Sequence, residues 1–174
     1  MNGQTLSRLA KAAHYVIART EPEKLGAVKL NKVLWFADVE HYRRTGRSIT
    51  GLSAYVRLPK GPVPDGIRPA LASLRAAGAI AVRKQKVFSY DRFEYVWLSE
   101  PDLTEFSPEE VDLLNQAIDA IQDLTAAEIS EYTHTDPLWI ELENGGRMPV
   151  GAASVINRIP DERELEWARG LPEQ

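Results

Sequence analysis

By residue type and spacing, His134 and Asp136 are the best candidates in this sequence for a catalytic pair. An imidazole beside a carboxylate is the pair that a general base needs. No candidate nucleophile is marked beside the pair, however, and Asp136 directly before Pro137 is better explained as a helix N-cap. The pair therefore specifies no reaction.

The sequence also lacks the common signatures of cofactor and metal binding. It has no phosphate-binding glycine loop, no His-Glu-x-x-His zinc motif and no Gly-x-Ser-x-Gly nucleophile turn. Without cysteine it has neither a disulfide nor a thiolate metal site. His14 and His41 fall on predicted helices, as ordinary polar or partly buried residues. We expect no catalytic residue, no cofactor and no metal, and a protein-binding domain rather than an enzyme.

Basic residues around a predicted hairpin suggest a different chemistry, the binding of nucleic acid. The order strand, helix, strand, strand over residues 49–98 resembles a winged-helix unit, whose basic hairpin would contact phosphates. The helix that would enter a major groove, residues 67–75, offers few base-reading side chains. DNA binding is therefore the alternative function. Its candidate contacts are Arg83, Lys84, Lys86 and Arg92.

Charge is divided sharply along the chain. The formal net charge is −4, but residues 24–92 hold 14 Lys and Arg against 4 Asp and Glu, a net of +10. Residues 93–174 hold 4 against 19, a net of −15. Two interpretations stay open: each half is a surface for an oppositely charged partner, or the two halves lie side by side and partly neutralise each other.

The bulk composition is that of a globular protein. The chain has 174 residues, of which 44% are hydrophobic and 26% charged, and this suits a single domain with a real core. No apolar run approaches the ~20 residues that span a bilayer, and charged residues interrupt the first apolar segment, unlike a signal peptide. Since cysteine is also absent, we expect a soluble, cytoplasmic protein with no membrane partner.

Hydrophobic periodicity and helix caps predict a single α+β domain that is mostly helical, with a small antiparallel sheet and a winged-helix-like β-hairpin. The helix expected at 28–44 is apolar on two faces, which is typical of a helix at the centre of a core. Capping boxes at Ser107–Glu110 and Thr125–Glu128 mark two later helix starts. The other expected elements are a helix at 5–19, an extended segment at 49–58, an irregular proline-rich segment at 59–64, a short helix at 67–74, strands at 79–88 and 93–98 joined by a turn at 89–92, a short helix from Asp136 and a peripheral helix at 161–169.

Several short motifs follow one another along the chain in a definite order. The set comprises Lys29, Leu30, Lys32, Leu34, Trp35, Ala37 and Asp38 in the second helix, then Gly46 and Ile49 to Gly51, then Gly61, Pro62 and Val63, and finally Ile129, Ser130, His134 and Trp139. In order and spacing the set resembles the Panacea domain family, the antitoxin domain typified by the SocA-like proteolytic adaptor and also found in phage-associated proteins. Trp35 departs from the tyrosine that is usual in the family. The likeness covers about residues 5–150, so we divide the chain into a Panacea-like domain, 1–150, and a C-terminal extension, 151–174, expected to be a packed helix.

The resemblance implies a bacterial antitoxin that binds and neutralises a protein toxin, usually encoded by the adjacent gene. Some members deliver the bound toxin to a protease such as ClpXP, and the family is not known for a catalytic centre. DNA binding would then be a secondary activity.

The family-motif positions are either structural or partner-binding. Lys29 and Lys32 lie three residues apart, so they would project together and meet either an acidic group of the domain or an acidic toxin surface. Gly61 and Pro62 are expected to form a turn where no side chain fits. His134 and Trp139 are expected to form a packed corner between the last helices. We interpret these positions, with Trp35 and Asp38, as architectural rather than as toxin contacts.

Overall fold

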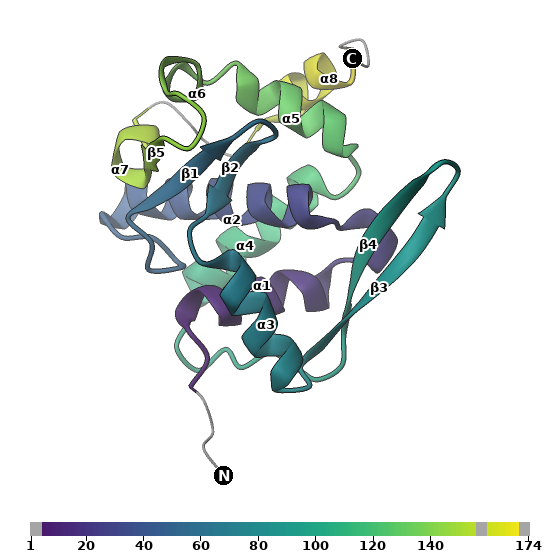
Figure 1. Ribbon diagram of the computed structural model, residues 1–174. Helices are drawn as coiled ribbons and strands as arrows, with labels where there is room; N and C mark the ends of the chain where they lie inside the picture. The colour runs from purple at the N-terminus through teal and green to yellow at the C-terminus, as the bar shows by residue number, and fades with distance from the viewer. Residues whose placement is uncertain (1–4, 156–159, 171–174) are drawn as a thin grey trace.

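The chain folds around one central helix, α2 (Ala27–Thr45), as Figure 1 shows. The computed structural model describes residues 5–155 and 160–170. Helices α1 (Arg8–Arg19) and α4 (Pro108–Ile121) pack against α2. Helix α2 buries apolar side chains on every side, among them Leu30, Val33, Leu34, Trp35, Phe36 and Val39. The prediction of a central second helix is confirmed.

Side-chain caps begin the later helices where the sequence places them. Helix α4 starts with the capping box of Ser107 and Glu110, and α5 (Ala126–His134) starts with that of Thr125 and Glu128. Asp136 caps α6 (Pro137–Glu141), because its side chain accepts a hydrogen bond from the Leu138 amide. The Asp136 carboxylate, which the sequence placed beside His134 as a possible catalytic partner, is therefore a helix cap.

A three-stranded antiparallel sheet, with the order β2-β1-β5, lies against α2. It consists of β1 (Ala54–Leu58), β2 (Gly61–Pro64) and β5 (Arg147–Pro149). The prediction of irregular structure at 59–64 is wrong for residues 61–64, which form β2. Because β2 is an edge strand, its prolines need not donate to a second neighbour.

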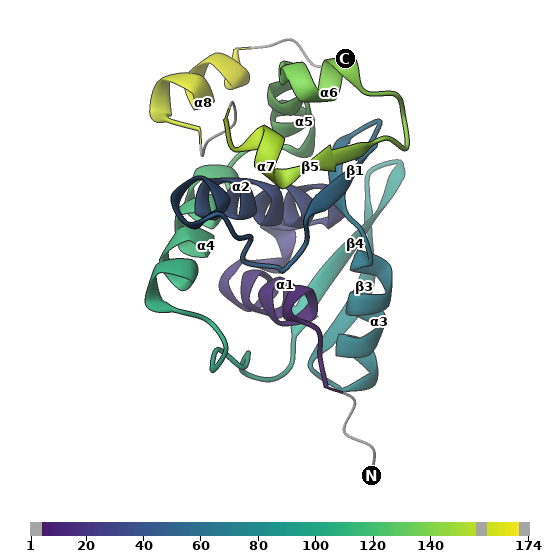
Figure 2. The ribbon, with the colours of Figure 1, turned by 90° about the vertical axis from the view of Figure 1, so that its left-hand side faces the viewer.

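Two elements were not predicted between the sixth helix and the tail. Strand β5 has three residues and helix α7 (Val150–Ala153) has four, so neither is long enough to show a periodic pattern. Helix α8 (Glu162–Arg169) confirms the expected peripheral helix. It packs on α5, on the far side of the molecule from the hairpin (Figure 2).

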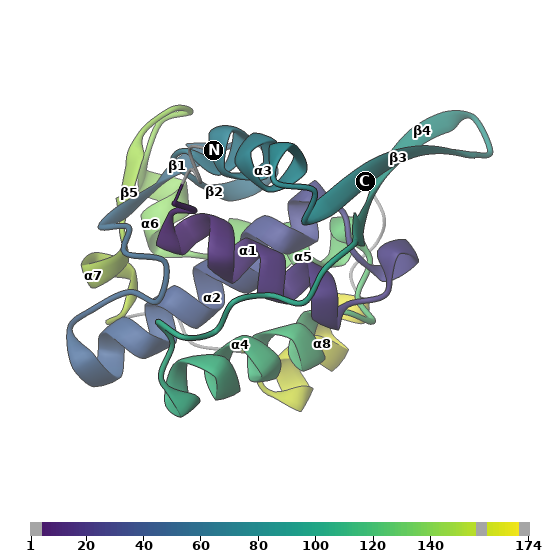
Figure 3. The ribbon, with the colours of Figure 1, turned by 90° about the horizontal axis from the view of Figure 1, so that it is seen from below.

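Strands β3 (Ile80–Val87) and β4 (Tyr90–Trp97) form a separate hairpin that projects from the body (Figures 1 and 3). Helix α3 (Ile67–Ala76) precedes it. The turn expected at 89–92 is wrong, because Val87 pairs with Tyr90 and the turn is Phe88–Ser89. In a winged helix the strand before the helix would join the hairpin, whereas here β1 and β2 belong to the other sheet.

A short 3-10 helix, η1 (Pro22–Lys24), joins α1 to α2. Within the described ranges, no helix is both long enough and apolar enough to cross a membrane.

Candidate protein-binding site

Lys32 of α2 reaches the turn between β1 and β2 from inside the protein. The residue is 1% exposed, and its Nζ donates a hydrogen bond to the Lys60 carbonyl oxygen at 2.5 Å. Burial lowers the pKa of the Lys32 amine to about 7, because a charged ammonium loses its hydration there. The side chain therefore ties the central helix to the sheet.

Helix α5 holds the same turn from a second side. Ser130 Oγ donates to the Lys60 carbonyl oxygen at 3.2 Å, and His134 Nε2 lies 2.9 Å from the Pro59 carbonyl oxygen. The latter hydrogen bond requires a proton on Nε2. The His134 ring stacks on Trp139, with ring centroids 4.1 Å apart and planes inclined by 22°. The expected packed corner of these two rings is confirmed.

Gly61 leaves the space that the Lys32 side chain occupies. A Cβ atom at Gly61 would lie 2.2 Å from Lys32 Nζ and 3.0 Å from Thr133 Oγ1. The residue also has a φ of +117°, which side chains other than that of glycine rarely adopt. The prediction that no side chain fits here is confirmed. Lys32, Lys60, Gly61, Ser130 and His134 are called the turn junction below.

Asp38 forms a second buried polar group, one α2 turn and a half beyond Lys32. Its carboxylate accepts hydrogen bonds from the Thr50 amide at 2.9 Å, from the Thr50 hydroxyl and from the Tyr55 hydroxyl at 2.7 Å. Burial raises the pKa of Asp38 to about 6, although these hydrogen bonds oppose the rise. Trp35 packs edge-on against Tyr55 at 4.9 Å. The group joins α2 to the segment that leads into β1.

Lys29 and Lys32 do not project together. Lys29 is half-buried and donates from Nζ to the Gln122 carbonyl oxygen at 2.8 Å, at the end of α4. Three residues along a helix still differ by about 60° in direction, so the two side chains diverge. Each ammonium hydrogen-bonds to a backbone carbonyl, whereas the sequence suggested either an acidic group of the domain or an acidic toxin surface.

The basic side chains of the hairpin are largely neutralised within it. Arg83 Nε lies 2.6 Å from Glu94 Oε2, Arg92 Nε lies 3.1 Å from Glu94 Oε1, and Lys84 Nζ lies 2.7 Å from Asp91 Oδ2. Burial alone would raise the pKa of Glu94, but the two guanidinium groups more than offset it and hold the pKa below its usual value. Of the four candidate nucleic-acid contacts, Lys86 alone forms no ion pair with a described residue.

Ion pairs also join the basic and acidic halves of the chain. Lys24 Nζ lies 3.2 Å from Asp123 Oδ1, and Arg44 Nη1 lies 3.5 Å from Glu109 Oε1. The interpretation that the two halves lie side by side and partly neutralise each other is supported at these two places.

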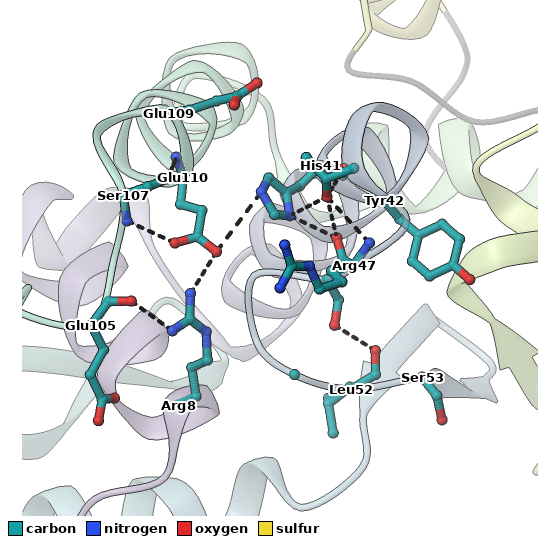
Figure 4. Close-up of a pocket in the computed structure, with 13 residues that line it drawn as sticks. Arg8, His41, Tyr42, Arg47, Leu52, Ser53, Glu105, Ser107, Glu109 and Glu110 are labelled. Atoms are coloured by element: carbon teal, nitrogen blue, oxygen red, sulfur yellow. Dashed lines mark hydrogen bonds and ion pairs between the residues drawn. The ribbon is translucent and has the colours of Figure 1, made fainter.

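A pocket of about 770 Å³ lies where the N-terminal ends of α1 and α4 meet the C-terminal end of α2 (Figure 4). Arg8 donates to Glu110 Oε1 at 2.5 Å, and Glu110 also accepts from the Ser107 amide. His41 Nδ1 hydrogen-bonds to the Arg47 carbonyl oxygen at 2.7 Å. These polar groups join helix ends to one another. Thr45 Oγ1 lies 3.3 Å from His41 Nδ1, but Nδ1 donates to the Arg47 carbonyl oxygen and the Thr45 hydroxyl donates to the His41 carbonyl oxygen at 2.9 Å, so this pair closes the end of α2 and is not arranged as nucleophile and base.

An apolar groove runs along the N-terminal end of α2, between the β1–β2 turn and the hairpin. It joins two hollows of about 330 and 610 Å³, which share Ala27, Val28 and Lys60. We call it the α2 groove. The first hollow is lined by Ala27, Val28, Asn31, Leu58, Pro59, Lys60, Pro62 and Val63, and the second adds η1, Leu25, Lys29, the segment 122–126 and residues 90–93 of β4. No pattern in the sequence predicted this groove. Only the aromatic residues at the end of an otherwise polar hairpin could have indicated a binding surface there.

The fold is that of a mostly helical α+β domain. The family of SocA-like antitoxins with a Panacea domain matches residues 30–140. The chain therefore belongs to the SocA-like Panacea domain family. Neither a curated protein nor a solved structure matches it.

Proposed function

We propose that the protein is an antitoxin that neutralises a cognate protein toxin by direct binding. The observation on which the proposal rests is membership of the antitoxin family over residues 30–140. Neutralisation would occur by covering the active surface of the toxin, which needs no catalytic group. The protein would work in the cytoplasm as a non-enzymatic partner of a toxin encoded by the adjacent gene, with or without transfer of that toxin to a ClpXP-type protease.

The geometry of the motif positions supports a structural role for most of them. Lys32, Asp38 and Gly61 are buried, and each contributes to a contact between α2 and the small sheet. Trp35, Pro62, His134 and Trp139 surround the same contacts, and Lys29 ties α2 to α4. In this proposal they hold α2, α4, α5 and the small sheet together as a rigid frame within a domain of residues 1–150, to which 151–174 is a packed extension. The toxin is chosen by side chains outside the frame.

DNA binding by the hairpin is not favoured by its electrostatics. Arg83, Lys84 and Arg92 already form ion pairs with carboxylates of the opposite or the same strand. Phosphate contacts would have to replace those pairs, which lowers the gain from counterion release. A toxin–antitoxin function needs no such rearrangement.

Co-expression with the product of the adjacent gene tests the proposal. That product is expected to stop growth when induced alone and to be harmless when this chain is present. The two proteins are expected to co-purify at physiological salt. A neighbour that is harmless alone, or one that stays toxic in the presence of this chain, contradicts the proposal.

A further inference from the structure

We infer that the α2 groove and the end of the β3–β4 hairpin together bind one segment of the toxin, and that this segment is amphipathic and acidic. The inference rests on the proposed function and adds to it the surface and the chemistry of the partner. It follows from three features of the free protein: exposed aromatic side chains, a strained turn and an excess of unpaired cations.

Three aromatic side chains at the end of the hairpin are exposed to solvent. Phe88 is 95% exposed, Tyr90 57% and Phe93 55%. Tyr90 and Phe93 line the α2 groove, whose floor includes Leu25 and Val28. Exposed aromatic rings beside an aliphatic floor are the composition of a binding hot spot, since both gain from the exclusion of water by a partner.

Phe88 has an unfavourable backbone conformation that no contact within this chain offsets. It is the first residue of the two-residue hairpin turn and has a φ of +53°, a conformation for which glycine is preferred. A bulky residue there costs about 1–2 kcal/mol. Because its ring is almost fully exposed, packing in the free protein does not offset this cost. Such a residue is best explained by a contact made only in a complex.

The groove carries more unpaired cations than unpaired anions. Lys29 and Lys60 line it and form no ion pair with a described residue, whereas Glu23 is the one acidic lining residue without an ion pair to a described residue. Lys86 adds a further unpaired cation on the adjacent strand, β3. This balance favours a segment with carboxylates along its edge, and the aliphatic floor and aromatic wall favour apolar side chains along its centre.

The turn junction prepares one wall of the groove in advance. Pro59 and Lys60 line the groove with their outer surfaces, while their carbonyl oxygens accept hydrogen bonds from His134, Lys32 and Ser130 behind them. A wall that is already fixed loses little conformational entropy when a partner binds. The aliphatic floor also distinguishes the site from a single-stranded nucleic-acid channel, in which a continuous basic groove follows the phosphates. Two of the lining cations, Lys24 and Arg92, are already paired with carboxylates.

Binding of the purified full chain to the purified product of the adjacent gene tests the inference. Phe93→Thr keeps a β-favouring residue and is expected to weaken binding about thirtyfold, the effect of losing a hot-spot ring. Lys60→Glu is expected to weaken it about tenfold and to reduce its salt dependence. Phe88→Gly is expected to weaken binding while the melting temperature stays the same or rises. Matched controls on α8, Trp167→Ser and Arg163→Glu, change an exposed ring and an exposed cation away from the groove and are expected to stay within about twofold.

The outcomes separate the inference from the proposed function. If the wild-type chain binds the toxin and the groove variants bind it equally well, the inference is wrong and the antitoxin function stands. If the α8 controls weaken binding and the groove variants do not, the docking surface lies on the other side. If the wild-type chain binds a fluorescent single-stranded oligonucleotide and not the neighbouring protein, both the function and the inference fall. Thermal unfolding of each variant shows that any loss of binding is not a loss of folding.

Discussion

The turn junction and the β3–β4 hairpin both contain charged side chains, but they use them in opposite ways. At the junction, Lys32 is buried without a carboxylate partner and hydrogen-bonds to a backbone carbonyl. On the hairpin, Arg83 and Arg92 neutralise Glu94 within a two-stranded element that projects from the body. The junction holds three elements together, whereas the hairpin's ion pairs stabilise only itself.

This difference suggests that the residues that stabilise the fold are not the ones that select a partner. Residues that mark the family lie where a substitution would disturb the contact between α2, α5 and the sheet. We expect the hairpin to tolerate changes of its exposed side chains, among them Phe88, Tyr90 and Phe93. A scaffold of this kind keeps its frame while its binding surface varies.

Gly61→Ala is expected to produce the largest loss of stability. The new Cβ would overlap Lys32 Nζ at 2.2 Å and would also force alanine into a φ of +117°. Because Lys32 is buried, its Nζ can move aside only by giving up its hydrogen bond to the Lys60 carbonyl oxygen, so the free energy of unfolding should fall by about 4 kcal/mol. Urea denaturation measures the change. Gly51→Ala is the matched control, because Gly51 has a φ of +81° but no atom near its missing Cβ; it should cost about 1 kcal/mol. Equal losses for the two variants would show that the junction has no special packing.

Lys32 should make stability depend on pH in the alkaline range. The folded chain releases the Lys32 proton near pH 7, whereas the unfolded chain keeps it until about 10.5. Between these values the unfolded state binds more protons, so the free energy of unfolding rises with pH, by about 4 kcal/mol between pH 7 and 10.5. Lys32→Met lacks this contribution. Denaturation of both proteins from pH 7 to 10 measures the difference between their slopes, and identical slopes would mean that Lys32 stays charged in the fold.

Asp38 should make the free energy of unfolding depend on pH in the acidic range, with a slope opposite in sign to that of Lys32. The unfolded chain loses the Asp38 proton near pH 3.8 and the folded chain near pH 6, because burial disfavours the carboxylate. Between these values the folded state holds more protons, so stability falls as pH rises, by about 2 kcal/mol. In Asp38→Asn this fall is expected to disappear from denaturation curves recorded between pH 4 and 6. A variant that retains the full slope would assign it to another group.

Glu94→Gln should have the smallest effect of the four, because the two arginine partners of Glu94 are partly exposed to solvent. The change leaves Arg83 and Arg92 without their carboxylate, and partly exposed ion pairs contribute about 1 kcal/mol or less. Thermal unfolding should shift by only a few degrees, while the affinity for a DNA duplex at low salt should rise as two guanidinium groups become available. A collapse of the fold would show that the hairpin is part of the frame.

Local patterns were enough to predict the frame. Two apolar faces identified α2 as the central helix, and Ser107 with Glu110 and Thr125 with Glu128 marked the starts of α4 and α5, because caps depend on residues a few positions apart. Strand β2 was missed because its prolines suggested irregular structure, and only the sheet order shows that it is an edge.

The candidate site was less predictable because it is formed by segments distant in sequence. Spacing alone placed Lys29 and Lys32 on one face, but it did not show that only Lys32 turns into the core. The α2 groove combines η1, α2, the β1–β2 turn, β4 and the segment after α4, and no local pattern brings these together. Phe88 and Phe93 were visible as aromatic residues, but their exposure depends on how far the hairpin extends from the body.

Hydrogen–deuterium exchange of the free chain and of its complex with the product of the adjacent gene tests most directly whether frame and binding surface are separate. Slower exchange is predicted in hairpin residues 84–93 and in residues 23–28 along the groove. Exchange at Ser130 and His134, the α5 residues of the turn junction, should change little. Protection confined to α7 and α8, with an unchanged hairpin, would contradict the account.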